Sequence, residues 1–192
     1  MNNKLPKDYF LHPDVVYLSK DLLGKVLCTN INGEYTSGII TETEAYAGVE
    51  DKASHAYGGR FTERTKTMYE EGGVSYVYLC YGIHHLFNIV TNKKGIPHAV
   101  LIRAVEPLDG LDIILKRRNA SKNNKKLLIG PGKVSQGLGI TTRLNNIPLT
   151  GNVIWLEDRG IKPGKIQTGK RIGVEYAGED ASLPYRFWSH EY

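Results

Sequence analysis

Cysteine is scarce in this chain of 192 residues, which contains only Cys28 and Cys80 and no CxxC pair. A zinc site built on cysteine therefore has no support. Both cysteines lie in apolar runs, which favours buried free thiols, with a disulfide between them as the alternative. The segment "GPGK", which ends at Lys133, lacks the spacing and the Ser or Thr of a P-loop, so we exclude a nucleoside triphosphate site of that kind.

Long apolar segments are also missing. The N-terminal "MNNKLPKDYF" has no hydrophobic signal core, and no run approaches the length of a membrane span. We therefore expect a cytoplasmic protein without membrane contact. The chain shows neither an internal repeat nor an interdomain linker, and its length suits one core, so residues 1–192 are predicted to form a single domain.

Positive charge is in excess, because 25 Lys and Arg face 20 Asp and Glu, for a net charge of +5. Such a balance favours an anionic partner such as nucleic acid. Part of the charge lies in the polar, glycine-punctuated segment 49–73, at Arg60, Arg64 and Lys66. Another part forms the run "KRRNASKNNKK" at 116–126, which is typical of a solvated loop, so its role stays open.

Turn residues and apolar periodicity predict an α+β fold with a largely antiparallel sheet and helices packed outside. A helix is expected from Pro13 to Gly24, and hairpins at Asn32-Gly33 and around 81–84. Segment 49–73 is predicted as a long loop with a short helix near its start. Further on we predict a strand in "HAVLIRAVEP", a helix in "LDGLDIILKRR", a small hairpin through "NVIWLED" and a last strand near "RIGVEYAG".

Two glutamates interrupt the apolar strand "GIITETEAYAG". Since alternate residues of a strand share a face, Glu42, Glu44 and Tyr46 point the same way. Carboxyl groups spaced about 6.5–7 Å apart at the backbone occur in glycoside hydrolysis. The alternative is an ion pair with a basic residue across the sheet. Arg103 is a candidate for that pair, with Glu42, Glu44 or Glu106, or it orients a catalytic carboxylate and a water.

Aromatic and imidazole side chains add further candidates. Tyr81 precedes Gly82 at the predicted hairpin tip, where an exposed ring suits stacking on bases or wedging between them. A ring folded back over the turn is the alternative. His55, in the glycine-rich "ASHAYGG", is a candidate wall of a site. His84 and His85 face opposite sides of a strand, so no metal site is expected there.

These residues together resemble a known family, the alkyladenine (3-methyladenine) DNA glycosylases of the mammalian type. The similarity runs through "ETEAYAGVEDKASHAYGGRFTERTKTMYEEGGVSYVYLCYGIHHLFNIVTN", "AVLIRAVEPLDGL", "GPGKVSQGLGI" and "RIGVEYAGEDASLPYRFW", and covers most of the chain. The resemblance implies a single domain with a curved antiparallel sheet and a protruding β-hairpin that inserts into DNA. It also implies a monomeric, monofunctional glycosylase without metal or redox cofactor, which removes alkylated or deaminated purines from double-stranded DNA.

The resemblance further implies roles for individual residues. Glu44 is the expected general base for a water, Arg103 holds that water and the carboxylate, and Glu42 falls on no catalytic position. The expected base-pocket residues are Tyr46, His55, Tyr78 and Asn88. The resemblance also implies DNA contact by the wedge Tyr81 and its neighbour Ile83. The basic residues Arg60, Arg64 and Lys133 are expected to contact DNA because of their charge. A catalytically silent damaged-DNA-binding module is the rival, against which the pairing of Glu44 with Arg103 argues.

Overall fold

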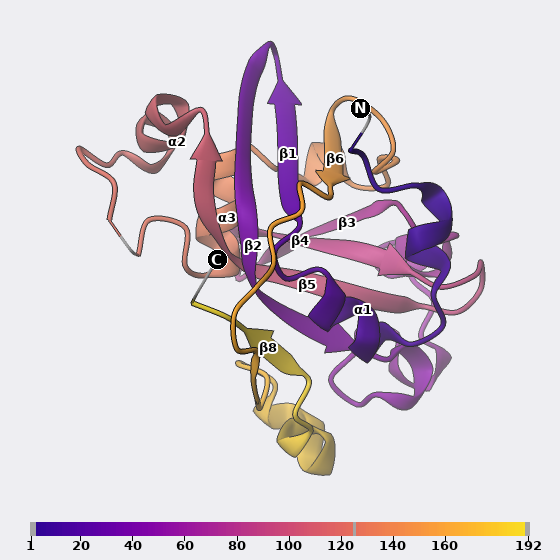
Figure 1. Ribbon diagram of the computed structural model, residues 1–192. Coiled ribbons are helices and arrows are strands. Elements are labelled where there is room, and N and C mark those ends of the chain that lie inside the picture. Colours follow the sequence, from indigo (N-terminus) through magenta and orange to yellow (C-terminus); the bar gives the residue numbers. More distant parts are fainter. Residues whose placement is uncertain (1–2, 125, 191–192) are drawn as a thin grey trace.

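An antiparallel sheet of eight strands forms the centre of the computed structural model, which describes residues 3–124 and 126–190 (Figure 1). Its strands are β1 Val26–Ile31, β2 Glu34–Tyr46, β3 Ser75–Cys80, β4 His84–Thr91, β5 His98–Asp109, β6 Ile154–Glu157, β7 Gln167–Gly169 and β8 Arg186–Trp188. Six of them follow the order β3-β4-β5-β2-β1-β6, while β8 pairs with both β2 and β7. The α+β, largely antiparallel fold predicted from the sequence is confirmed.

The two longest strands bend. Between β2 and β5 the pairing shifts register on either side of Glu42, so that Thr41 and Arg103 fall out of the ladder as bulge residues. Figure 1 shows β2 and β5 changing direction in their middle, which curves the sheet. The curved sheet expected from the resemblance is therefore present, and its bend lies where the glutamates interrupt the apolar run.

Helices pack against this sheet. The α-helices are α1 Val15–Asp21, α2 Leu111–Arg118 and α3 Pro131–Leu138. Short 3-10 helices are η1 Lys7–Leu11, η2 Gly48–Glu50, η3 Tyr57–Gly59, η4 Lys66–Tyr69, η5 Thr142–Leu144 and η6 Glu175–Ser182. α1 contacts β2 and β5, and α3 contacts β4 and β5. Among the described residues, no helix has the length and apolar character needed to cross a membrane.

The first helix starts later than predicted. Asp14 is its N-cap, and its carboxylate accepts hydrogen bonds from the amides of Val16 and Tyr17. Pro13 therefore lies before the helix and not in its first turn. The end near Gly24 is as predicted, since this glycine has a φ of +84°. A Cβ there would lie 2.5 Å from the carbonyl oxygen of Ile161, so no larger residue fits.

Both predicted hairpins are present. Asn32 and Gly33 have φ values of 56° and 83°, as a type I′ turn requires. In the second hairpin Tyr81 and Gly82 also have positive φ values, 51° and 73°, and the amide of Ile83 donates to the Cys80 carbonyl at 3.1 Å. A bulky side chain in this conformation is uncommon and marks strained positions, often functional ones.

Three segments of the C-terminal third differ from what the sequence led us to expect. "GPGKVSQGLGI", for which no element was predicted, forms α3. Pro131 starts this helix, and Gly139, with a φ of +72°, ends it. "NVIWLED" contains β6, whose ladder is with β1; its local antiparallel pairing is limited to one bridge between Thr150 and Trp155. "RIGVEYAG" is no strand: Gly173 has a φ of +75°, and the chain continues into η6.

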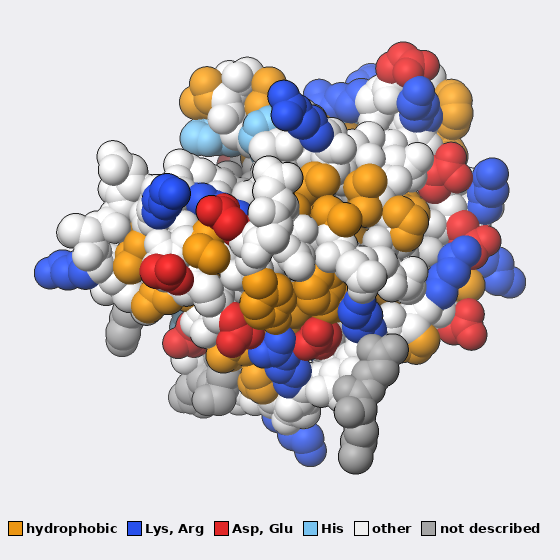
Figure 2. All heavy atoms as spheres, turned by 90° about the horizontal axis from the view of Figure 1, so that it is seen from above, with side chains coloured by type: hydrophobic (Ala, Val, Ile, Leu, Met, Phe, Trp, Pro, Cys, Tyr) orange, Lys and Arg blue, Asp and Glu red, His pale blue; other side chains and the backbone are white. Residues whose placement is uncertain are grey.

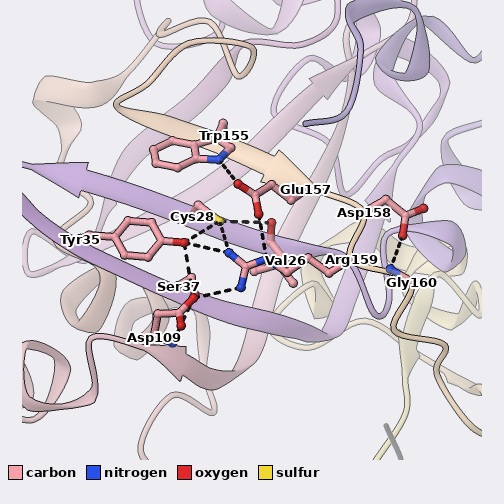
Figure 3. A network of polar contacts seen from close by, with 10 residues as sticks. All are labelled: Val26, Cys28, Tyr35, Ser37, Asp109, Trp155, Glu157, Asp158, Arg159 and Gly160. Carbon is pink, nitrogen blue, oxygen red and sulfur yellow. Dashed lines mark hydrogen bonds and ion pairs between the residues drawn. The ribbon is translucent and has the colours of Figure 1, made fainter. Parts of the chain in front are cut away.

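A polar network joins β1, β2, β5 and β6 (Figure 3). Arg159 is its centre and donates to Glu157 at 2.7 Å, to Asp109 at 3.0 Å and to the Tyr35 hydroxyl at 2.8 Å. Cys28 lies buried beside it as a free thiol, and burial raises its pKa to about 11. None of these residues lines the cavity described below, so we assign the network to the stability of the sheet.

The second cysteine, Cys80, differs from Cys28 in its burial. Cys80 is also a free thiol, but it is only half-buried, so the prediction of two buried thiols holds for Cys28 alone.

The basic run at 116–126 begins within α2 and continues into a turn, and Lys125 lies outside the described residues.

Candidate active site

A cavity of about 610 Å³ opens beside the β3–β4 hairpin, a size typical of small-molecule sites. Its lining comes from the β3–β4 hairpin, from β2 and β5, from the 53–68 segment, from the first turn of α3 and from residues 172–176. The residues predicted from the sequence that line it are Tyr46, His55, Arg64, Tyr78, Tyr81, Asn88, Arg103 and Lys133. Chain segments far apart in sequence therefore converge on one place.

Glu44 lies directly beneath this cavity and is completely buried. One carboxylate oxygen accepts the Ile172 amide at 2.8 Å. The other accepts the Tyr46 hydroxyl at 2.9 Å and an Arg103 guanidinium N–H at 3.4 Å. Since Tyr46, Arg103 and Ile172 all line the cavity, one layer of hydrogen-bond donors separates the carboxylate from it.

The surroundings of Glu44 shift its protonation. Burial raises the pKa of the carboxyl above its ordinary value, while Arg103, the Ile172 amide and the Tyr46 hydroxyl act in the opposite direction. Burial prevails, and the pKa is raised. A carboxylate of raised pKa is a better proton acceptor, which suits a general base.

Arg103 bridges the two glutamates. Its Nε donates to Glu42 at 3.1 Å, in addition to the bond from Nη1 to Glu44. Glu42 also pairs with Arg186 at 3.1 Å, and its side chain is 14% exposed. The alternatives left open by the sequence thus combine: Arg103 forms an ion pair and also orients a buried carboxylate. Arg103 is a bulge residue of β5, and both of its carboxylate partners lie on the neighbouring strand β2.

Aromatic rings form one wall of the cavity. His55 packs edge-on against Tyr78, with ring centres 4.7 Å apart, and its Nδ1 lies 2.9 Å from the Tyr76 hydroxyl. Buried Asn88 donates to the Tyr76 carbonyl at 3.1 Å, which fixes the amide at the cavity surface. Tyr76 was interpreted as core from the sequence, and it is buried, but it also holds His55 in place.

A buried ion pair next to the site was missed by the sequence reasoning. The Arg171 guanidinium binds the Asp51 carboxylate through two bonds of 2.5 Å and 2.8 Å, and both side chains are at most 1% exposed. Arg171 also donates to the Ala45 carbonyl at 2.9 Å. It directly precedes Ile172, whose amide binds Glu44. The only signal in the sequence was the charge of Arg171 at the start of an apolar segment.

In residues 3–124 and 126–190, no group of three or more His, Cys, Asp or Glu side chains has the arrangement of a metal site. The Asp51 carboxylate is bound to Arg171. His85 accepts the Thr142 amide through its Nδ1 at 3.2 Å.

The residues predicted to contact DNA differ in whether they line the cavity. Tyr81 and Ile83 are 90% and 71% exposed at the hairpin tip, so Tyr81 does not fold back over the turn. Arg64 and Lys133 lie at the cavity, whereas Arg60 and Ile83 are not part of its lining. Figure 2 shows one face of the molecule, on which Lys and Arg are interspersed with Asp and Glu, so net charge alone does not mark a DNA-binding face.

Comparisons with known proteins agree on one family. The family model described as methylpurine-DNA glycosylase matches residues 9–192. A Chlamydia abortus protein provisionally named 3-methyladenine DNA glycosylase is 50% identical over 187 residues, which cover 97% of this chain and 98% of that protein. Proteins with the same provisional name from Desulfitobacterium hafniense and Bacillus cereus are 41% and 42% identical, and each match covers 93% of this chain and 92% of the relative.

Proposed function

The chain belongs to the methylpurine-DNA glycosylase family of base-excision-repair enzymes, and we propose that it acts on damaged purines flipped out of double-stranded DNA. The N-glycosidic bond is hydrolysed and an abasic site remains. The proposed substrates are 3-methyladenine, 7-methylguanine, hypoxanthine and ethenoadenine. We further propose that the enzyme acts as a monomer.

The observation that carries this proposal is the buried Glu44 carboxylate held beneath the cavity by Tyr46, Arg103 and Ile172. In the proposed mechanism Glu44 takes a proton from a water that Arg103 orients, and the water oxygen forms a bond to the sugar C1′. The bond from C1′ to the base nitrogen breaks, and its electron pair leaves with the base. A cationic base departs as a neutral molecule without an added proton.

The cavity wall suits a purine that has left the stack. We propose that Tyr46 lies against one face of the base and His55 with Tyr78 against the other. Flipping costs a few kcal/mol, least for a damaged or mispaired base, and stacking on aromatic rings offsets part of that cost. We propose that Asn88, whose amide donates to the Tyr76 carbonyl, disfavours the exocyclic amine of guanine.

Base release from defined duplexes tests this function. Matched duplexes carrying one of the four proposed lesions, or none, are incubated with the protein in EDTA. We expect release of at least one lesion and none from the undamaged control. Binding without release would instead support the damaged-DNA-binding module. Release that disappears with the chelator would contradict a metal-free mechanism.

Replacement of Tyr81 tests the proposed wedge. Tyr81→Ala should weaken capture of the flipped base about 10- to 100-fold, since the ring would no longer fill the gap in the base stack. Its side chain is 90% exposed, so the thermal midpoint should not change. Lesion binding and single-turnover release are the measurements. Tyr17→Ala, at an exposed tyrosine of α1, is the matched control, and equal behaviour of the two variants would contradict the wedge.

A further inference from the structure

Arg64 lies on the aromatic wall of the cavity. Its guanidinium carbon is 4.6 Å from the centre of the Tyr78 ring, and its Nη2 is 3.2 Å from Nε2 of His55. The neighbouring Thr65 is buried, and its hydroxyl donates to the Arg60 carbonyl at 2.9 Å, which anchors the loop. A positive charge therefore rests on the two rings against which the flipped base is proposed to stack.

The contact determines how His55 is protonated. A guanidinium can only donate, so Nε2 of His55 accepts and the ring proton lies on Nδ1, pointing at the Tyr76 hydroxyl. Burial, together with the charges of Arg64 and Arg60, lowers the pKa of His55 to about 4. At neutral pH this wall is thus an uncharged aromatic surface that is in contact with the Arg64 cation.

The Tyr46 side of the cavity differs in its charge balance. There the Arg171 guanidinium lies 4.9 Å from the Tyr46 ring centre, but Asp51 neutralises it through a bidentate pair. Among the ion pairs found for residues 3–124 and 126–190, none involves Arg64. Both tyrosine walls therefore carry an arginine, and the charge of Arg64 alone is left without a carboxylate.

This asymmetry bears on which bases the pocket accepts. On the basis of the proposed function, we infer that Arg64 is a specificity-determining residue that disfavours cationic bases and favours neutral purines with hydrogen-bond acceptors. A cationic base such as 7-methylguanine meets a like charge beside the Tyr78 ring. A neutral base such as hypoxanthine meets no repulsion, and its oxygen and ring nitrogens accept N–H groups from the guanidinium.

The competing interpretation is that Arg64 swings out to a DNA phosphate, as the sequence suggested. A phosphate contact would support all lesions equally, because it reads no base. Loss of this contact would also make the binding constant less dependent on salt. The slope of its logarithm against the logarithm of salt concentration would change by about 0.9, the value for one phosphate. Lesion preference and salt dependence therefore separate the two roles.

The experiment compares the wild-type protein with Arg64→Met, which keeps length without charge, and Arg64→Lys, which keeps charge without the planar fork. Single-turnover release and binding are measured with 7-methylguanine and with hypoxanthine in one duplex sequence, at several salt concentrations. Arg64→Met should raise the ratio of 7-methylguanine to hypoxanthine release about tenfold, the size of a partly screened charge interaction. Arg64→Lys should stay closer to the wild-type ratio. Since Arg64 is exposed, both variants should fold, which thermal melting checks.

An equal loss on both lesions with a smaller salt slope would overturn the inference in favour of a phosphate contact. Unchanged release of both lesions by Arg64→Met would overturn it as well. A wild-type protein that releases none of the four proposed lesions would refute the proposed function itself, and this result is visible before any variant is compared.

Discussion

Glu44→Gln should lower the rate of base release by at least about 100-fold while leaving binding of lesion DNA intact. Glutamine cannot take a proton from water, but its carbonyl oxygen can still accept the Ile172 amide, so the local geometry survives. Single-turnover release and equilibrium binding on one lesion duplex measure the two quantities. Undiminished release would remove Glu44 as the general base.

The thermal stability of Glu44→Gln should not fall along with its activity. Because burial raises the pKa of Glu44 in the folded state, the folded protein binds this proton more tightly than the unfolded chain does. Stability therefore falls as pH rises from the ordinary carboxyl value through the raised pKa, and the charged form costs stability at neutral pH. Since Arg103 keeps Glu42 as a partner, Glu44→Gln should melt at the same or a higher temperature.

The pH dependence of the wild-type enzyme should carry the same signature. A base must be deprotonated, so release should rise with pH through a pKa above the ordinary carboxyl value, and Glu44→Gln should lack that rise. Glu42→Gln is the matched control on the same strand. Glu42 binds Arg103 and Arg186 and falls on no catalytic position, so its loss should reduce release far less. Equal effects of the two substitutions would contradict the separation of roles.

Asp51→Ala should destabilise the protein by about 3–5 kcal/mol, because it leaves the buried Arg171 guanidinium without a counter-charge. The substitution also removes the acceptor for the amides of Ala47 and Ala53. Such a loss is large relative to the total stability of a small domain, about 5–15 kcal/mol. Urea unfolding is the measurement. The rate of base release, measured at temperatures below the melting transition, should also fall, since Arg171 precedes the Ile172 amide that binds Glu44.

Two controls accompany Asp51→Ala. Glu63→Ala breaks an exposed pair with Lys66, whose side chains are 91% and 52% exposed, and should cost at most about 1 kcal/mol. The double variant Asp51→Ala/Arg171→Met should recover part of the lost stability, because no unpaired charge then remains buried. A cost for Asp51→Ala no larger than that of Glu63→Ala would show that the ion pair does not organise this region.

Prediction from sequence succeeded where a few neighbouring residues decide the backbone. Asn32-Gly33 specifies a tight turn through its own φ preferences, and Gly82 marks the second turn, where Tyr81 adopts a positive φ against its preference. The same reasoning missed α3, because its glycine-rich sequence has low helix propensity. Burial of Val134 and Leu138 against the sheet stabilises that helix instead. "RIGVEYAG" is no strand because Gly173 has a positive φ, and its first residue, Arg171, is bound by Asp51, 120 residues away.

The sequence by itself determined that Glu44 and Tyr46 share one face of a strand and that Tyr81 stands at a hairpin tip. Strand alternation and turn chemistry act over two to four residues, so both follow from local order. Only the tertiary structure decided which glutamate is sealed beneath the cavity, because Glu42 and Glu44 have the same periodicity and both touch Arg103. Their difference comes from Ile172, 128 residues from Glu44, and from Arg186, 144 residues from Glu42. No local pattern encodes such contacts, because the packing of the whole chain brings these residues together.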